Sequence, residues 1–141
     1  MSLDYCCCLI AGALLAMSGA AGADELRCYL DYGGEVRVLH AGAVDSPYTV
    51  PTQAIGSYFL FRMVLQTQPP DLASIKLYVF VDRDRGPLPL HQATYAYPPP
   101  ASSNREHGFT GLHHVYEPIR DGELKYWCEW TAASASVGAS S

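Results

Sequence analysis

The chain has 141 residues, of which 49% are hydrophobic and 16% are charged, and its formal charge is -5 at neutral pH. This length allows one domain, and the apolar content is sufficient for a packed core, which excludes a wholly disordered chain. A mildly acidic protein lacks the basic face that sequence-independent nucleic-acid binding requires. We therefore expect no nucleic-acid partner.

The first 23 residues have the pattern of an export signal. An apolar run precedes several small residues, and Ala21 and Ala23 occupy the third and first positions before the expected cleavage site. We predict a signal-peptide helix over residues 1–23 and a periplasmic or secreted mature chain that begins at Asp24. The run is short for a stable membrane span, which needs about 20 apolar residues. An uncleaved anchor is the alternative, because the segment contains Asp4 and no Lys or Arg.

The five cysteines divide between the signal and the rest of the chain. Three of them are consecutive in the apolar run and would be removed with it. Cys28 and Cys128 remain, and an even number of cysteines in an exported domain predicts one disulfide. It would close a loop of about 100 residues. Two separately buried thiols are the alternative.

After the predicted cleavage site the hydrophobic pattern is that of β-strands. Apolar and polar residues alternate from 26 to 40 around Gly33-Gly34, which predicts a hairpin with a tight turn. Residues 41–51 are rich in turn formers, so we expect a connection there. Residues 57–67 are the strongest predicted strand. The apolar side chains that share one face of this strand are Phe59, Phe61, Met63 and Leu65.

The same alternation continues through the middle of the chain. Residues 75–81 predict a strand, and the charged sequence at 82–86 predicts the turn that ends it. Residues 87–97 predict a further strand at a sheet edge, because its two prolines cannot donate to an interior ladder. Residues 98–108 contain three consecutive prolines and predict the longest loop.

The last part of the chain is the clearest hairpin. Residues 112–119 and 123–131 predict its two strands, and Asp121-Gly122 favours the turn between them. Residues 132–141 are Ala, Ser, Gly and one Val, which is typical of a flexible tail. The side chains expected on one face of the final strand are Leu124, Tyr126, Cys128 and Trp130.

Seven or eight short strands without a convincing helix after the signal predict a single all-β domain over residues 24–131. We expect a small antiparallel β-sandwich, and a small barrel is the alternative. The cysteine pair and the strand count resemble immunoglobulin-like domains, which implies an immunoglobulin-like topology. The chain departs from that pattern because both tryptophans, Trp127 and Trp130, lie beside the second cysteine.

Histidines are the candidate metal ligands. His91, His107, His113 and His114 lie in the second half of the chain, and imidazole is the commonest protein ligand for zinc and copper. Because His113 and His114 are adjacent on a predicted strand, only one of them can join a given site. The pattern allows a copper or zinc site from His91, His107 and one of this pair. Exposed or hydrogen-bonded surface histidines are the simpler interpretation.

The sequence contains no pattern typical of catalysis. No Gly-x-Ser-x-Gly motif occurs, and the two mature cysteines are assigned to the disulfide. Asp82 and Asp84 alternate with arginines, which is typical of a solvated turn. We therefore predict a protein that is not an enzyme, with no catalytic residues and no resident cofactor.

Aromatic residues suggest a binding surface. Trp127 and Trp130 are three positions apart on one predicted strand and must point to opposite faces. We expect Trp127, with Tyr97 and Tyr116, to form a surface for another protein or a carbohydrate, unless Trp127 packs beneath the loop at 98–108. The leading hypothesis is an exported binding or accessory module for an unknown protein or small ligand. The alternative is a periplasmic copper- or zinc-binding protein.

Overall fold

The computed structural model of the chain describes residues 22–101 and 106–133. Residues 1–21 of the predicted signal-peptide helix and residues 134–141 of the predicted tail lie outside these ranges. The described part contains β-strands and two short 3-10 turns but no α-helix. None of its helical segments is long and apolar enough to cross a membrane.

The prediction of an all-β chain is confirmed. The strands, in chain order, are β1 (Glu25–Tyr32), β2 (Glu35–Val44), β3 (Gln53–Ile55), β4 (Phe59–Gln66), β5 (Ser74–Val81), β6 (Leu88–Ala96), β7 (His113–Glu117) and β8 (Gly122–Thr131). The two 3-10 turns are η1 (Pro47–Thr49) and η2 (Pro70–Leu72). Both turns have proline in their first positions, where its missing N–H costs no hydrogen bond.

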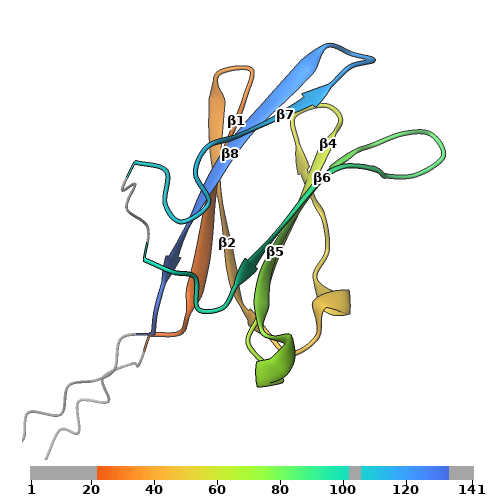
Figure 1. Cartoon of the computed structure of the whole chain (residues 1–141). Coiled ribbons are helices and arrows are strands. Elements are labelled where there is room, and N and C mark those ends of the chain that lie inside the picture. Colours follow the sequence, from red (N-terminus) through yellow and green to blue (C-terminus); the bar gives the residue numbers. More distant parts are fainter. Residues whose placement is uncertain (1–21, 102–105, 134–141) are drawn as a thin grey trace, which may run out of the picture.

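The strands form one hydrogen-bonded sheet that nearly closes into a barrel. Their order is β6-β5-β4-β2-β1-β8-β7, and β3 pairs with β4 beside this path. Figure 1 shows β1, β2 and β8 on one side of the molecule, and β4, β5 and β6 on the other. β2 and β4 join these halves through a short parallel pairing of Ala43 with Leu65 and Val44 with Gln66. The other named strand pairs are antiparallel.

The expected sandwich with immunoglobulin-like topology is not confirmed. β2 continues to Val44, through part of the segment predicted as a connection, and so reaches β4. The two halves are therefore joined by strand hydrogen bonds instead of forming separate sheets. Cys28 and Cys128 lie on neighbouring strands, whereas the disulfide of immunoglobulin domains links two sheets.

The core fills the space between the two halves. In β1 and β5 every second residue is buried, which is the alternation that their sequences predict. The four apolar side chains predicted to share one face of β4 are all buried. The largest wholly buried side chains include Tyr126, Phe59, Phe61, Leu26 and Leu30. Burial of rings and branched chains from both halves stabilises the closed shape.

The predicted disulfide is confirmed. Cys28 and Cys128 are direct partners in the antiparallel register of β1 and β8, with their Cα atoms 4.1 Å apart. Both side chains are wholly buried. The bond therefore links β1 and β8, the first and last described strands in chain order, across a sequence separation of 100 residues.

The segment after residue 105 returns along β8 before β7 begins. Gly108 forms an isolated bridge with Cys128, and the Phe109 N–H donates to the Cys128 carbonyl at 3.1 Å. Gly108 has a φ of 58°, and a Cβ at this position would overlap the Cys128 carbonyl. A glycine is required here by both conformation and space. This close approach places the preceding residue, His107, beside the outer face of β8.

Candidate functional site

Three of the directly opposed residue pairs on the outer face of β1 and β8 surround the disulfide and combine charge with aromatic rings. Because Cys28 and Cys128 face the core, their neighbours in each strand face outward. These pairs are Arg27 with Glu129, Tyr29 with Trp127, and Asp31 with Lys125. An aromatic pair is thus flanked along the strands by two pairs of opposite charge.

Tyr29 and Trp127 form the centre of this surface. Their rings are stacked, with centroids 4.1 Å apart and an interplanar angle of 11°. The His107 ring approaches Trp127 edge-on, at a centroid distance of 5.9 Å and an angle of 79°. Tyr29, Trp127 and His107 are all partly exposed. Trp127 therefore faces outward and is also contacted by the end of the long loop, which combines the two interpretations that its sequence allowed.

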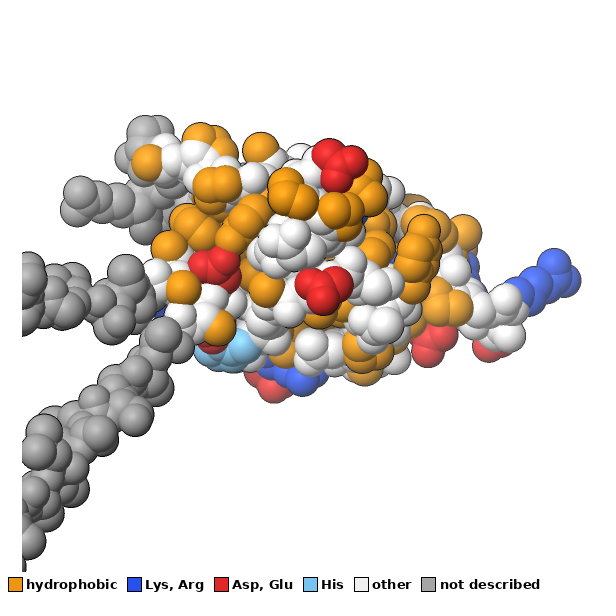
Figure 2. Space-filling model, turned by 90° about the horizontal axis from the view of Figure 1, so that it is seen from below, with side chains coloured by type: hydrophobic (Ala, Val, Ile, Leu, Met, Phe, Trp, Pro, Cys, Tyr) orange, Lys and Arg blue, Asp and Glu red, His pale blue; other side chains and the backbone are white. Residues whose placement is uncertain are grey.

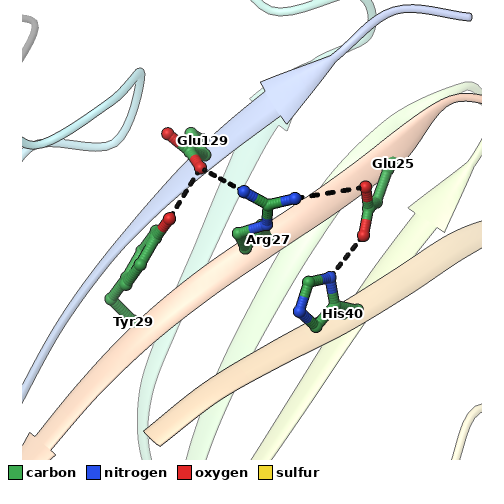
Figure 3. Close-up of polar contacts among 5 residues, drawn as sticks. All are labelled: Glu25, Arg27, Tyr29, His40 and Glu129. Carbon is green, nitrogen blue, oxygen red and sulfur yellow. Dashed lines mark hydrogen bonds and ion pairs between the residues drawn. The ribbon is translucent and has the colours of Figure 1, made fainter. Parts of the chain in front are cut away.

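A chain of polar contacts holds the Tyr29 side chain (Figure 3). The Tyr29 hydroxyl donates to Glu129 Oε1 at 2.8 Å, and Arg27 donates to the same oxygen at 3.3 Å. Arg27 also forms an ion pair with Glu25 at 3.6 Å, and His40 contacts Glu25 from β2. The bond from His40, helped by the charge of Arg27, holds the pKa of Glu25 below its usual value. The orientation of the stacked ring is fixed by these partners.

A cleft of about 320 Å³ opens beside the aromatic pair. Its lining combines rings, aliphatic side chains and charged groups: Tyr29, Asp31, Val36, His107, Leu112, Lys125 and Trp127. Asp31 accepts a hydrogen bond at 3.1 Å from the Gly34 N–H in the adjacent turn, which fixes its carboxylate at the rim. This volume is near the lower end of the range for small-ligand sites.

Two larger hollows lie at the end of the molecule formed by the β5–β6 and β7–β8 connections. Their volumes are about 510 and 610 Å³, and both include Arg83 and Asp84 in their lining. Arg83 already donates to the buried Glu117 at 2.7 Å. The Arg120 guanidinium lies over the Tyr58 ring, 4.8 Å from its centroid. These two cations are thus engaged within the protein, and neither hollow has in its lining a stacked aromatic pair such as Tyr29 and Trp127.

The opposite end of the molecule has an apolar surface. Figure 2 looks onto this end and shows hydrophobic side chains over much of the visible face. Tyr48 in η1 is 91% exposed, and Leu72 in η2 is 58% exposed. Acidic side chains are scattered over this face, and basic side chains lie toward its margins.

Two of the predicted metal ligands meet where the sheet nearly closes. His91 on β6 and His113 on β7 have ring centroids 5.2 Å apart. His91 Nε2 and the Tyr126 hydroxyl are 2.8 Å apart, and His113 Nε2 and the Tyr95 hydroxyl are 2.9 Å apart. Burial, aided for His91 by the charge of His113, lowers the pKa of both imidazoles.

The other predicted metal ligands lie apart from this pair. His107 contacts Trp127, and His114 faces outward on β7, where its Nδ1 lies 3.2 Å from Glu123 Oε1. Across residues 22–101 and 106–133, no group of three or more His, Cys, Asp or Glu side chains could hold a metal ion. The structure thus brings together His91 and His113 alone from the predicted set.

The structure also separates the three predicted members of the aromatic surface. Tyr97 points toward the core side, where its ring packs edge-on against Trp130 at 5.9 Å and its hydroxyl donates to Asp24. Tyr116 is 54% exposed on β7 and donates to Asp121 at 2.5 Å. Trp127 is the member that lines the cleft.

The partners of Trp127 were missed from the sequence, although a signal for them was present. Pairing Cys28 directly with Cys128 sets the register of two antiparallel strands. In that register Tyr29 faces Trp127, and Asp31 faces Lys125. The sequence pattern places both cysteines on terminal strands, but by itself it does not show that these strands are neighbours.

Comparison of the chain with protein-family models, with curated proteins and with solved structures gave no match. The cleft beside Trp127 combines a fixed aromatic pair, aliphatic walls and charged rim groups. That combination favours recognition of a ligand with both apolar and hydrogen-bonding surfaces.

Proposed function

We propose that this protein is an exported, non-catalytic binding module, and that the cleft beside Tyr29 and Trp127 is its binding site. The observation that carries the proposal is the stacked ring pair whose tyrosine is bonded to Glu129. Rings that are already fixed lose little conformational entropy when a ligand covers them. The site is therefore organised for binding before any partner arrives.

The chemistry of the chain supports a role without turnover. Both cysteines of the described chain are joined in a disulfide and offer no thiolate nucleophile. His91 and His113 are each hydrogen-bonded to a tyrosine, and His40 and His114 each contact a glutamate. A tyrosine hydroxyl is protonated at neutral pH and is then a weak nucleophile. Burial raises the pKa of Tyr95 above its ordinary value, which keeps this hydroxyl protonated.

Export is supported by the disulfide and by the signal pattern of the first 23 residues. A disulfide persists most readily in an oxidising compartment. The test is the intact mass and N-terminal sequence of protein recovered from the periplasm and the medium. We expect a chain that begins at Asp24, and a chain that retains Met1 would contradict cleavage.

The binding proposal can be tested with three immobilised forms of the mature protein: wild type, Trp127→Ala and Tyr116→Ala. Tyr116 is an exposed aromatic residue outside the cleft and is the matched control. Periplasmic and culture extracts, divided into low-mass and protein fractions, are passed over each form. We expect a component that wild type and Tyr116→Ala retain and Trp127→Ala releases.

Two results would overturn the binding proposal. One is equal retention by all three forms, since the cleft would then contribute nothing. The other is turnover of a hydrolase substrate that a single point mutation abolishes, because this would make the protein an enzyme. Circular dichroism of each form checks that the substitutions leave the fold intact.

A second candidate function is metal binding, favoured by the contact of His91 with His113. Burial lowers the pKa of both imidazoles, which favours the neutral ring, the form that binds metal. The test is titration of the purified protein with Cu²⁺ and with Zn²⁺. Stoichiometric binding lost in His91→Ala and kept in His114→Ala supports this function. Binding that neither change affects excludes it.

A further inference from the structure

We propose that the ligand of the cleft beside Trp127 is a carbohydrate. This inference rests on the proposed binding function and adds the chemical class of the ligand. It depends on the way in which the cleft alternates apolar ring surface with hydrogen-bonding groups. A sugar ring has the same alternation, because its C–H bonds form apolar patches and its hydroxyls surround them.

The apolar part of the cleft fits the C–H face of a sugar. The face of an aromatic ring carries partial negative charge, which attracts the weakly positive hydrogens of C–H bonds. Tyr29 and Trp127 are stacked, so each covers one face of the other ring, and the ring surface that remains open lines the cleft together with Val36 and Leu112. Val36 is 60% exposed and Leu112 is 42% exposed, so a ligand could cover substantial apolar area.

The polar part of the cleft fits hydroxyl groups. The Asp31 carboxylate accepts hydrogen bonds, the Lys125 ammonium donates them, and the His107 imidazole does either according to its tautomer. A hydroxyl both donates and accepts, so it can satisfy each of these groups. Asp31 and Lys125 are direct partners in the register of β1 and β8, and Lys125 also forms an ion pair with Glu123 at 3.9 Å, so the rim carries charges of both signs. The rim therefore favours a neutral ligand with many hydroxyls over a strongly charged one.

A proline-rich peptide is the competing ligand, since aromatic grooves also bind extended proline segments. Such a peptide has few donors because proline lacks the backbone N–H. Binding it would cover three polar side chains of the cleft without giving them full hydrogen-bond partners, which costs affinity. A carbohydrate satisfies them.

The chain offers a clean optical probe of this cleft because it has only two tryptophans. Trp130 faces the core side, and its indole nitrogen is buried with no hydrogen-bond partner in the part of the chain that the structure describes. Trp130→Phe therefore removes an unsatisfied polar group and keeps a ring against Tyr97. In this variant the tryptophan fluorescence comes from Trp127 alone.

The experiment titrates mature Trp130→Phe protein with soluble oligosaccharides of cellulose, chitin, starch and mannan, and with a poly-L-proline peptide. We expect at least one oligosaccharide to shift the Trp127 emission in a saturable way. Replacing Tyr29 with Ala in this background should weaken that binding about tenfold or more, as for a central aromatic contact. Tyr116→Ala, a change outside the cleft, should leave the affinity unchanged.

A milder pair of variants protects the test against misfolding. Asp31→Asn keeps the acceptor that caps the adjacent turn, and Lys125→Gln keeps much of the length of its side chain. Both should weaken oligosaccharide binding while thermal unfolding stays close to that of the parent. The rings remain in place in these variants, so their effect reports on the hydrogen bonds of the rim.

The outcomes separate the ligand class from the binding function. Saturable oligosaccharide binding that depends on Tyr29 supports the inference. Binding of poly-L-proline with no response to any oligosaccharide overturns it and leaves the binding function standing. No response to any oligosaccharide also overturns it, and the extract experiment then decides whether the cleft binds another ligand.

Discussion

Cys28 and Cys128 occupy directly opposed positions on β1 and β8, with their Cα atoms 4.1 Å apart. Their bond lies within one side of the nearly closed sheet and also fixes which residues face each other on the outer surface. Tyr29 follows Cys28 and Trp127 precedes Cys128, so the antiparallel register places these two residues opposite each other. The disulfide thus connects the stability of the domain to the geometry of the candidate site.

Replacing both cysteines with Ala should destabilise the domain by about 2–5 kcal/mol. The bond closes a loop of about 100 residues, so its loss frees nearly the whole unfolded chain. At about 4 °C per kcal/mol the melting temperature should fall by about 10 °C or more. Thermal unfolding followed by circular dichroism measures the change.

Wild-type protein unfolded without reductant provides the control for this prediction. It should contain no free thiol in the mature chain, and thiol titration measures this directly. Reduced wild type should unfold at a temperature close to that of the double Ala variant. A reduced protein as stable as the oxidised one would contradict the role assigned to the bond.

Gly108→Ala should be much more destabilising than Gly42→Ala. Gly108 has a left-handed φ, and an added Cβ would overlap the Cys128 backbone, which cannot move freely within β8. We expect the backbone conformation alone to lower the free energy of unfolding by about 1–3 kcal/mol. Gly42 has open space around its Cβ position, so its substitution is the matched control. Urea unfolding of both variants makes the comparison, and equal stabilities would contradict the close approach.

Local sequence signals predicted most of the strands. The alternation in residues 26–40 and the strong turn at Gly33-Gly34 correspond to the β1–β2 hairpin. Pro89 in β6 and Pro87 just before it correctly placed that strand at one end of the sheet. These predictions succeeded because strand periodicity and turn chemistry act over a few neighbouring residues.

The closure of the sheet was not predictable in this way. It depends on the parallel pairing of Ala43 and Val44 with β4, which joins residues far apart in the chain. β3 was also missed, because it has only three residues and a mostly exposed face. On β2 the alternating valines Val36 and Val38 are exposed, and Leu39 is the buried residue. Tertiary pairing, which local pattern does not contain, decides these features.

Replacing Glu117 with Ala should cost about 3–5 kcal/mol of stability. This carboxylate is wholly buried at the end of β7 and accepts hydrogen bonds from Arg83 and from the Ile119 and Arg120 N–H groups. Its loss leaves the arginine without its ion-pair partner and the backbone donors of the β7–β8 turn without an acceptor. Denaturant unfolding measures the difference in stability.

The matched control for this change is Glu123→Ala on the same hairpin. Glu123 is exposed and contacts His114 and Lys125 at the surface, so its substitution should change stability by no more than about 0.5 kcal/mol. If Glu117→Ala were as mild as this control, the buried ion pair would not stabilise the turn. Combining Glu117→Ala with Arg83→Ala measures the coupling between the two side chains, and strictly additive effects would exclude a direct interaction.

The last prediction concerns pH and the two histidines between β6 and β7. In the folded protein burial lowers the pKa of His91 and His113 below the usual value of about 6.5. The phenols that face them, Tyr95 and Tyr126, are neutral, because burial raises the pKa of both. No carboxylate is hydrogen-bonded to either ring within the described chain. Protonation would thus place two like charges side by side where the sheet closes.

Stability should therefore fall as the pH drops below about 6.5. Below about pH 6.5 the imidazoles of the unfolded chain bind more protons than those of the folded protein, so acid favours unfolding. Above this pH the imidazoles are neutral in both states and do not lower the stability. Glu25, whose pKa is also lowered, acts only at more acidic pH, near and below its usual value of 4.5. Urea unfolding between about pH 7.5 and pH 5 measures this slope. The double variant His91→Gln with His113→Gln should flatten the slope, whereas His107→Gln, outside the contact between β6 and β7, should preserve it. An unchanged slope in the double variant would exclude these imidazoles as its source.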